Sequence, residues 1–131
     1  MLSKTIVFTA PKTAELIERN VKEIKEDLVL VDTEYTAVSG GTERANILGL
    51  PNAGGNNFPK VLGYCGVGYV KEIGDKVTKV SVGDRVLVYH GHHTKYNLVP
   101  ESDLTLVEDD NIDSLDASLV IIASMGLGGV R

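Results

Sequence analysis

The sequence has little cysteine, little clustered basic charge and no long apolar run. One cysteine, Cys65, occurs among 131 residues, which excludes a framework of internal disulfides and a structural zinc site made of four cysteines. The formal net charge is −5, and the basic residues of positions 22–26 alternate with acidic ones. Because nucleic-acid binding relies on clustered Lys and Arg, we expect no nucleic-acid partner.

Signals for membrane insertion and export are also missing. The longest apolar stretch, residues 115–125, contains Ser118 and Ser124 and is too short to cross a bilayer. Residues 1–7 lack the long apolar core and the small-residue cleavage site of a signal peptide. Together with the single cysteine, these features lead us to expect a cytoplasmic protein with no membrane span.

Strand patterns dominate the chain, and its length suits one hydrophobic core. We therefore expect one domain over residues 1–131, mainly β with short helices. Two early strands are separated by a Pro11-Lys12 turn, and alternating or apolar runs predict five more. The predicted strands cover residues 4–9, 14–21, 28–38, 67–73, 86–89, 96–99 and 104–107.

Two regions depart from the strand pattern. Residues 46–60 are rich in Gly, Asn and Pro and predict a long, mobile loop. Near the end of the chain, Asp113 is typical of an N-cap, with Asp116 at the third helical position, before a helix over residues 115–124. This helix is apolar on nearly all sides and is expected to be buried all round, which predicts a partner chain or a further domain against it.

The most specific pattern is the spacing of the glycines between residues 63 and 83. Gly74-Asp75 and Gly83-Asp84 are turn sequences, whereas glycines inside a strand leave room for another backbone or for a ligand. The frame consists of Gly63, Gly68, Gly74 and Val77, followed by Val82-Gly83-Asp84-Arg85-Val86.

This frame resembles the catalytic, GroES-like domain of the medium-chain, zinc-type alcohol dehydrogenase family, whose signature reads G-H-E, two residues, G, five residues, G, two residues and a small aliphatic. The resemblance implies a GroES-like, partly open β-barrel. It also implies that residues from about 113 onward lead toward a nucleotide-binding Rossmann domain outside this chain. NAD(P) would be held by that domain, because Gly126-Leu127-Gly128-Gly129 follows a helix rather than a strand.

The zinc ligands of the family are replaced in this sequence. Tyr64 and Cys65 stand at the His-Glu positions, and Gly40 stands where the first cysteine ligand is expected. A catalytic zinc needs three protein ligands, so the resemblance points to a branch without zinc.

Three histidines offer a second source of metal ligands. On a strand, His90 and His92 would point to the same face, with His93 beside them. However, Gly91 and the polar residues that follow favour a turn exposed to solvent, and we expect no metal site there.

The resemblance carries three candidate catalytic residues to this chain. Thr42 occupies the hydroxyl position of the family's C-x-[ST]-D segment and would relay the proton that accompanies hydride transfer. Glu43 occupies the acidic position, which is tied into the active-site scaffold. Tyr64 would donate a hydrogen bond to a substrate carbonyl.

Each candidate also has a structural interpretation. Thr42 could cap a turn, Glu43 could form a surface pair with Arg44, and Tyr64 could be a packed aromatic. For Cys65 a small buried side chain is favoured over a nucleophile, because no basic residue adjoins it in the sequence.

Two functions from different classes remain open. The first is the catalytic portion of a zinc-independent, NAD(P)-dependent alcohol or carbonyl oxidoreductase, inactive without its nucleotide-binding domain. The second is a self-standing GroES-like binding or assembly module, which would self-associate through the C-terminal helix and touch a partner with residues 46–60.

Overall fold

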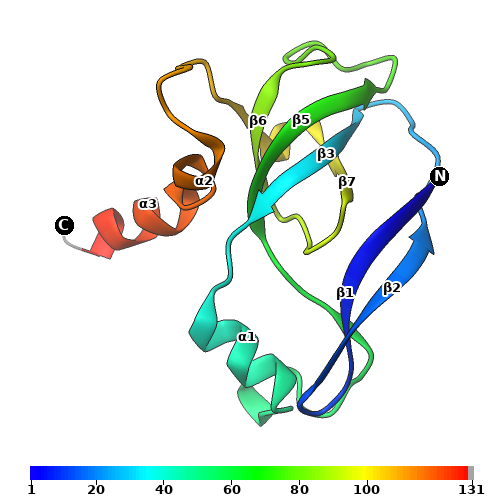
Figure 1. Ribbon diagram of the computed structural model, residues 1–131, viewed down its shortest axis with the longest axis vertical. Coiled ribbons are helices and arrows are strands. Elements are labelled where there is room, and N and C mark those ends of the chain that lie inside the picture. The colour runs from blue at the N-terminus through cyan, green and yellow to red at the C-terminus, as the bar shows by residue number, and fades with distance from the viewer. Residues whose placement is uncertain (130–131) are drawn as a thin grey trace.

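The computed structural model describes residues 1–129, in which eight strands form two antiparallel sheets. The larger sheet has the order β7-β3-β5-β6-β8 and the smaller one the order β2-β1-β4. Figure 1 shows the β1–β2 hairpin on the side of the molecule opposite α3. The strands are β1 (Leu2–Ala10), β2 (Thr13–Asn20), β3 (Leu28–Thr36), β4 (Lys60–Val61), β5 (Cys65–Ile73), β6 (Arg85–Tyr89), β7 (Tyr96–Pro100) and β8 (Leu104–Leu106).

Short helices connect and flank these strands, so the predicted fold class, mainly β with short helices, is confirmed. The helices are α1 (Gly40–Ile47), η1 (Pro51–Ala53), η2 (Glu101–Asp103), α2 (Ser114–Ala117) and α3 (Val120–Gly129). The predicted strand over residues 28–38 ends earlier, at Thr36, and α1 was not predicted. None of the helices in residues 1–129 is long and apolar enough to cross a membrane.

The two sheets are joined but do not close into a complete barrel. Residues 93–95 lie between β1 and β7 and bond to β1: the Ile6 N–H donates to the carbonyl of His93 at 2.9 Å, and the Lys95 N–H donates to that of Lys4 at 2.9 Å. Thr5 and Thr94 form an isolated bridge at the same place. This connection fixes the hairpin against the larger sheet.

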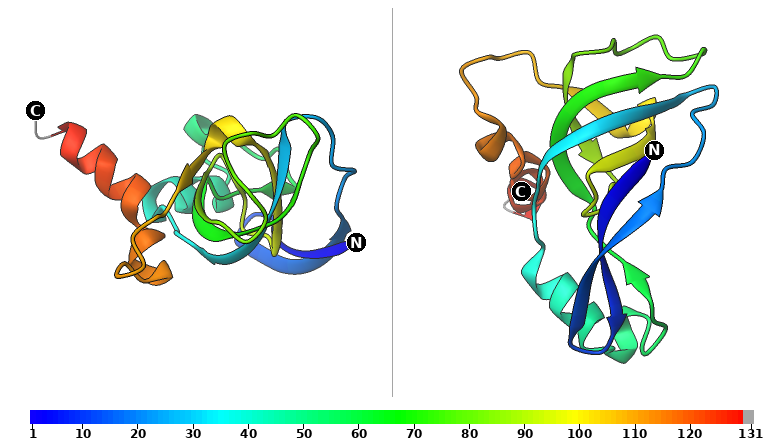
Figure 2. Two further views of the ribbon diagram at one scale, coloured as in Figure 1. Left: turned by 90° about the horizontal axis from the view of Figure 1, so that it is seen from above. Right: turned by 45° about the vertical axis from the view of Figure 1, so that its right-hand side comes forward.

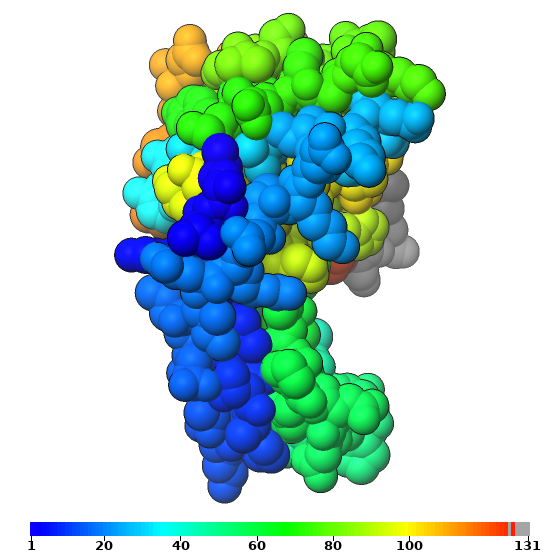
Figure 3. All heavy atoms as spheres, turned by 90° about the vertical axis from the view of Figure 1, so that its right-hand side faces the viewer, coloured from blue at the N-terminus to red at the C-terminus, as the bar shows by residue number. Residues whose placement is uncertain are grey.

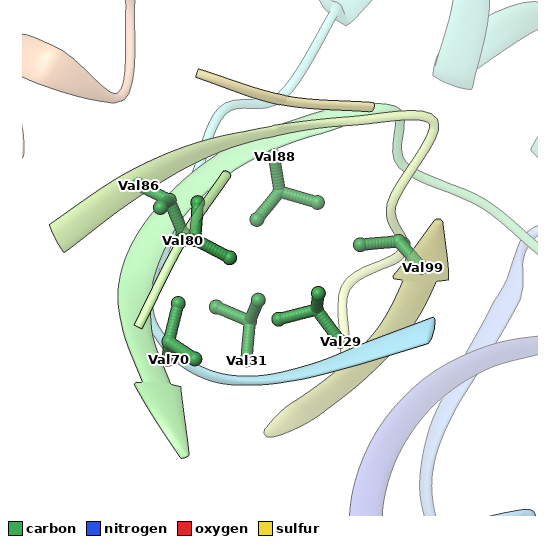
Figure 4. Packing of buried hydrophobic residues seen from close by; sticks show 7 residues of the cluster. All are labelled: Val29, Val31, Val70, Val80, Val86, Val88 and Val99. Carbon is green, nitrogen blue, oxygen red and sulfur yellow. The ribbon is translucent and has the colours of Figure 1, made fainter. Parts of the chain in front are cut away.

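Valine fills the interior of the larger sheet. Valine is branched at Cβ, which suits strands and packs well on a pleated surface. Figure 4 shows seven valines from both sides of the curved sheet pointing toward one another. They are Val29, Val31, Val70, Val80, Val86, Val88 and Val99.

Close backbone approach explains three glycines of the sequence frame. A Cβ at Gly63, where φ is +104°, would lie 2.8 Å from the amide nitrogen of His93. Side chains at Gly68 and Gly74 would overlap the carbonyl oxygens of Asp32 and Glu26. At all three positions the obstacle is backbone, which cannot move aside as a side chain could.

The segment predicted as a loop, residues 46–60, is built around the ammonium group of Lys60. This group donates to the carbonyls of Asn46 at 3.0 Å, Ala53 at 3.0 Å and Gly55 at 2.9 Å. It also lies 4.6 Å from the centre of the Phe58 ring. One cation therefore holds the end of α1, η1 and the following turn together.

The C-terminal helix differs from its prediction in two ways. Asp113 is the predicted N-cap and accepts the N–H of Asp116 at 2.8 Å, but the helix is divided into α2 and α3. Ser118 donates to the carbonyl of Leu115 at 2.6 Å at the break, a local bond that competes with helix continuation. Figures 1 and 2 show α3 projecting from the sheets, and Leu119 is 53% exposed. The helix also continues past the predicted residue 124, to Gly129. The partner chain or further domain expected against its exposed side stays a prediction.

Candidate functional site

A carboxylate, an imidazole and a hydroxyl meet beneath α1. Thr36 Oγ1 lies 2.6 Å from His93 Nδ1, and His93 Nε2 forms a short hydrogen bond with Glu43 Oε1. The backbone N–H of Ser39 donates to Glu43 Oε2 at 2.9 Å. Glu43 and His93 are each only 8% exposed. We call these three side chains the Glu43–His93–Thr36 group.

The group is formed by three separate parts of the chain. Thr36 is the last residue of β3, Glu43 lies in the first turns of α1, and His93 belongs to the segment that binds β1. Ser39 is the N-cap of α1, yet its side chain makes no capping bond. The carboxylate of Glu43 accepts a hydrogen bond from the backbone N–H of Ser39. This bond stabilises the start of the helix.

The order of these groups permits one hydrogen-bond chain. With Glu43 ionised, its carboxylate accepts a hydrogen bond from the N–H at His93 Nε2. The other ring nitrogen, Nδ1, then accepts a hydrogen bond from the Thr36 hydroxyl. A buried carboxylate that accepts two bonds is far less costly than an unpaired one. The group can therefore anchor α1, and its two hydrogen bonds fix the position of the proton on the His93 ring.

The prediction that the histidines lie in a solvent-exposed turn is wrong for His93. The backbone N–H of His93 donates to the carbonyl of Leu62 at 3.0 Å, and the backbone carbonyl of His93 accepts from the Ile6 N–H. With the backbone bonded on both sides, the imidazole points inward. His90 and His92 are exposed, and His90 Nδ1 lies 3.3 Å from Asp103. No group of three potential metal ligands gathers among residues 1–129.

A weak signal for His93 exists in the sequence. Asn97 and Val99 are buried positions of β7, and the strand period of two, extended backward, reaches His93 and Gly91. The exposed Lys95 breaks this alternation. Thr36 carries no sequence signal that separates it from the other threonines of β3.

Thr42 is adjacent to Glu43 on α1 but is exposed to solvent. Its hydroxyl oxygen lies 3.4 Å from that of Ser39, which is a long contact for a capping bond. The proposed surface pair of Glu43 with Arg44 is wrong, because Glu43 is buried and bonds to His93 and Ser39. The helix is thus anchored through Glu43 and presents the neighbouring hydroxyl to solvent.

Tyr64 lies where the larger sheet meets α3. Its ring meets that of Tyr89 edge-on, with centroids 6.2 Å apart, and its hydroxyl lies 3.9 Å from the sulfur of Met125. Tyr89 and Met125, with Ile121, also line a hollow of about 380 Å³. The same hollow is also lined by the polar residues Ser102, Asp103, Thr105 and Ser124, and the half-buried Tyr64 lies beside it.

Cys65 is a buried, protonated thiol. Burial raises its pKa, and the negative charge of Glu43 raises it further, while a hydrogen bond from the backbone of Ala37 acts in the opposite direction. The Ala37 N–H also donates to the Cys65 carbonyl at 3.1 Å. Glu43 and the start of β5 therefore share one electrostatic environment.

The structure does not join the candidate residues into one bonded group. Thr42 and Glu43 are neighbours on α1, and Tyr64 directly precedes β5. Among the hydrogen bonds of the described residues, none joins Tyr64 to Thr42 or Glu43. The side chains at the family's ligand positions do not fit zinc: Gly40 has none, Tyr64 is a phenol, and Cys65 is held as a thiol.

Comparison with protein families matches residues 25–126 to the alcohol dehydrogenase GroES-like domain. A sorbitol dehydrogenase of Bombyx mori is 35% identical over 68 residues, which are 52% of this chain and 20% of that protein. An S-(hydroxymethyl)glutathione dehydrogenase of Escherichia coli is 38% identical over 88 residues, 66% of this chain and 23% of that protein. The chain thus spans about a fifth of these curated relatives.

Solved structures share the fold. A Bacillus thuringiensis protein described as an NADPH:quinone reductase superposes with a TM-score of 0.76 at 23% identity, over 90% of this chain and 37% of that one. An Escherichia coli oxidoreductase/dehydrogenase of unknown specificity gives a TM-score of 0.77 at 24% identity, over 92% of this chain and 44% of that one.

Proposed function

Because the chain belongs to the alcohol dehydrogenase GroES-like domain family, we propose that it is the catalytic portion of a zinc-independent, NAD(P)-dependent oxidoreductase acting on alcohols or carbonyls. The curated relatives, named as sorbitol and S-(hydroxymethyl)glutathione dehydrogenases, support this reaction class. The chain covers a minor part of their length, so the remaining functions of such an enzyme belong to another domain.

The anchoring of α1 is the observation that carries the proposal. Glu43 is fixed from below by His93 and by the Ser39 N–H, while Thr42 on the same helix is exposed. A general acid or base must reach its proton within hydrogen-bond distance and hold its position. A helix anchored at its first turn with an accessible hydroxyl suits both requirements, and we assign Thr42 the role of proton relay.

Tyr64 supplies the second polar contact to the substrate. Its half-buried phenol is positioned by Tyr89 and faces the sulfur of Met125, a weak acceptor that a carbonyl oxygen can replace. A donor placed in an apolar surrounding stabilises the charge that develops on a carbonyl oxygen. This contact takes the place that a Lewis acid has in zinc-dependent members.

The described residues provide no dinucleotide fingerprint. The glycines at positions 126, 128 and 129 fall within α3, whereas the fingerprint requires glycines between a strand and a following helix. A nicotinamide would supply the hydride when bound to a separate nucleotide-binding domain packed near α3. We therefore expect residues 1–131 alone to be inactive.

The test joins this chain, through α3, to the nucleotide-binding half of a solved relative and measures NADPH and NADH oxidation with aldehydes, ketones and quinones. We expect turnover that persists after dialysis against EDTA, and no turnover by the chain alone. Thr42→Val should lower kcat by about 10²–10⁴-fold, the range for loss of a proton-transfer group. Thr42→Ser keeps the hydroxyl and should retain activity.

Thr13→Val is the matched control, because Thr13 is an exposed threonine of the hairpin, distant along the chain from α1. Equal kcat in the Thr42→Val and native fusions would reject the relay. Activity lost with EDTA and restored by zinc would reject zinc independence.

The second candidate function, a binding or assembly module, is favoured by one observation. Several apolar side chains of the α2–α3 region are exposed, including Leu115, Leu119 and Leu127. Monomers rarely leave large apolar patches uncovered. A partner chain would bury the same surface that a nucleotide-binding domain would.

A further inference from the structure

A cavity of about 270 Å³ opens between the β1–β2 hairpin and the segment that runs into β7. Figure 3 shows this side of the molecule, where the blue hairpin meets yellow-green residues of the 92–98 region. Three basic side chains line the cavity, Arg19, Lys22 and His92, and no Asp or Glu does so. In a chain of net charge −5, a cavity with only basic charge is unusual.

The two permanent charges of the cavity have no acidic partner among the described side chains. The ion pairs of residues 1–129 include neither Arg19 nor Lys22. The pKa of His92 is lowered, first by partial desolvation of its ring and then by the positive charge of Arg19, while a bond with the Leu62 carbonyl acts in the opposite direction. Arg19 and His92 are therefore close enough to repel each other.

Hydroxyl groups form one wall of the cavity, beside Arg19, because Ser3 is the cross-strand partner of Arg19. Thr94 Oγ1 lies 2.7 Å from Ser3 Oγ and 2.7 Å from Thr5 Oγ1, and Ser3 Oγ accepts the Tyr96 N–H at 2.9 Å. The two bonds between hydroxyls use two of the three hydroxyl protons. The third has only the Lys4 carbonyl, at 3.4 Å, so it remains available to a better acceptor in the cavity.

We propose that this cavity binds a small oxyanion, a phosphate or carboxylate group, held by Arg19, Lys22 and the hydroxyl wall. The planar guanidinium of Arg19 can donate two parallel bonds to two oxygens of such a group. Lys22 adds charge without fixed geometry. The bound anion removes the repulsion at His92, which then takes up a proton and becomes a third cationic contact.

This site takes a ligand other than the proposed substrate, although His92 is the sequence neighbour of His93, which bonds to Glu43. The hairpin that carries Arg19 lies on the side of the molecule away from α3 (Figure 1). Neither Thr42 nor Tyr64 lines the cavity. Its ligand is therefore an additional one and not the alcohol or carbonyl of the proposed reaction.

The experiment titrates the whole chain with inorganic phosphate and, separately, with acetate, at constant ionic strength set by chloride, and follows amide and imidazole signals by NMR. We expect saturable shifts confined to Ser3, Arg19, Lys22, His92 and Thr94, and a rise in the pKa of His92 at saturation. Tighter binding of phosphate identifies a phosphate group as the ligand class, and tighter binding of acetate identifies a carboxylate.

Arg19→Gln should weaken binding by about tenfold or more, as expected for loss of a charge-assisted pair of bonds. Without the anion, the same variant should show a higher His92 pKa than the native chain, which also verifies that its cavity is folded. Arg44→Gln, an exposed arginine on α1 outside the cavity, is the matched control and should bind normally. The proposal is overturned by shifts that do not saturate, or by equal affinity in Arg19→Gln.

Discussion

At the scale of single residues, the carboxylate of Glu43 has two effects. It accepts hydrogen bonds from His93 and Ser39, and it raises the pKa of the Cys65 thiol beside it. The first effect fixes α1, and the second adds to burial, which is the larger cause of the raised pKa. One buried carboxylate therefore both anchors the helix and disfavours the thiolate.

The reactivity of Cys65 measures this second effect. Glu43→Gln removes the charge but keeps the shape, so the midpoint of the pH–rate profile for alkylation by iodoacetamide should move to lower pH. It should stay above the ordinary thiol value because burial, the larger cause, is unchanged. Glu34→Gln, an exposed carboxylate on β3, should leave the midpoint in place. An unchanged midpoint in Glu43→Gln would contradict the coupling.

Of the three side chains of the Glu43–His93–Thr36 group, the sequence indicated only Glu43 as a site residue. Thr42 and Glu43 were identified through the family resemblance, and Cys65 was correctly expected to be a small buried side chain. His93 and Thr36 were missed because the bonds that define them join residues 50 and 57 positions apart. A local pattern contains no information on such pairs until the strands are in register.

At the scale of elements, Lys60 holds residues 46–60 in shape. Three carbonyls point at its ammonium group from α1, η1 and the turn that follows η1. The glycines and asparagines of this segment correctly predicted irregular backbone. They could not predict its organisation, because the cation that provides it is a single lysine at the end of the segment.

Lys60→Met tests this arrangement. The substitution preserves the aliphatic stem but leaves three carbonyls without their donor, and we expect a loss of about 2 kcal/mol in the free energy of unfolding. Urea denaturation measures the loss, and hydrogen exchange should show faster exchange confined to residues 46–60. Lys79→Met, an exposed lysine near a turn, serves as the control. Equal stability of the two variants would show that Lys60 does not hold the segment.

The positions of β1 and β7 were predictable because buried and exposed residues alternate along them, and those of β3 and β6 because each contains a run of buried apolar residues. The C-terminal helix was predicted with the correct N-cap, Asp113. Its division into α2 and α3 was not foreseen, since the bond from Ser118 to the Leu115 carbonyl depends on a rotamer and not on composition.

At the scale of the whole molecule, α2 and α3 expose an apolar surface that the rest of the chain does not cover. Ala117 and Ile121 pack against Val67 and Leu87 of the larger sheet, but the opposite side of the helices faces solvent (Figure 2). The resemblance implied that a further domain lies there. The further domain stays a proposal. The structure describes only the apolar surface that this domain would cover.

We expect the isolated chain to self-associate through this surface as its concentration rises. Leu119→Glu places a charge at a 53% exposed apolar position and should shift sedimentation toward the monomer, with a change in unfolding free energy within about 0.5 kcal/mol. Leu16→Glu, a 65% exposed position on β2, should not change association. A native chain that remains monomeric at all concentrations would contradict the expectation.

The glycine frame of this chain has a consequence for how its descent can be traced. A side chain at Gly63, Gly68 or Gly74 would collide with the backbone of a neighbouring segment, whether or not the protein catalyses anything. Selection for folding alone therefore keeps these glycines. A descendant without catalytic activity would still carry them, so these glycines are a mark of ancestry and not of activity.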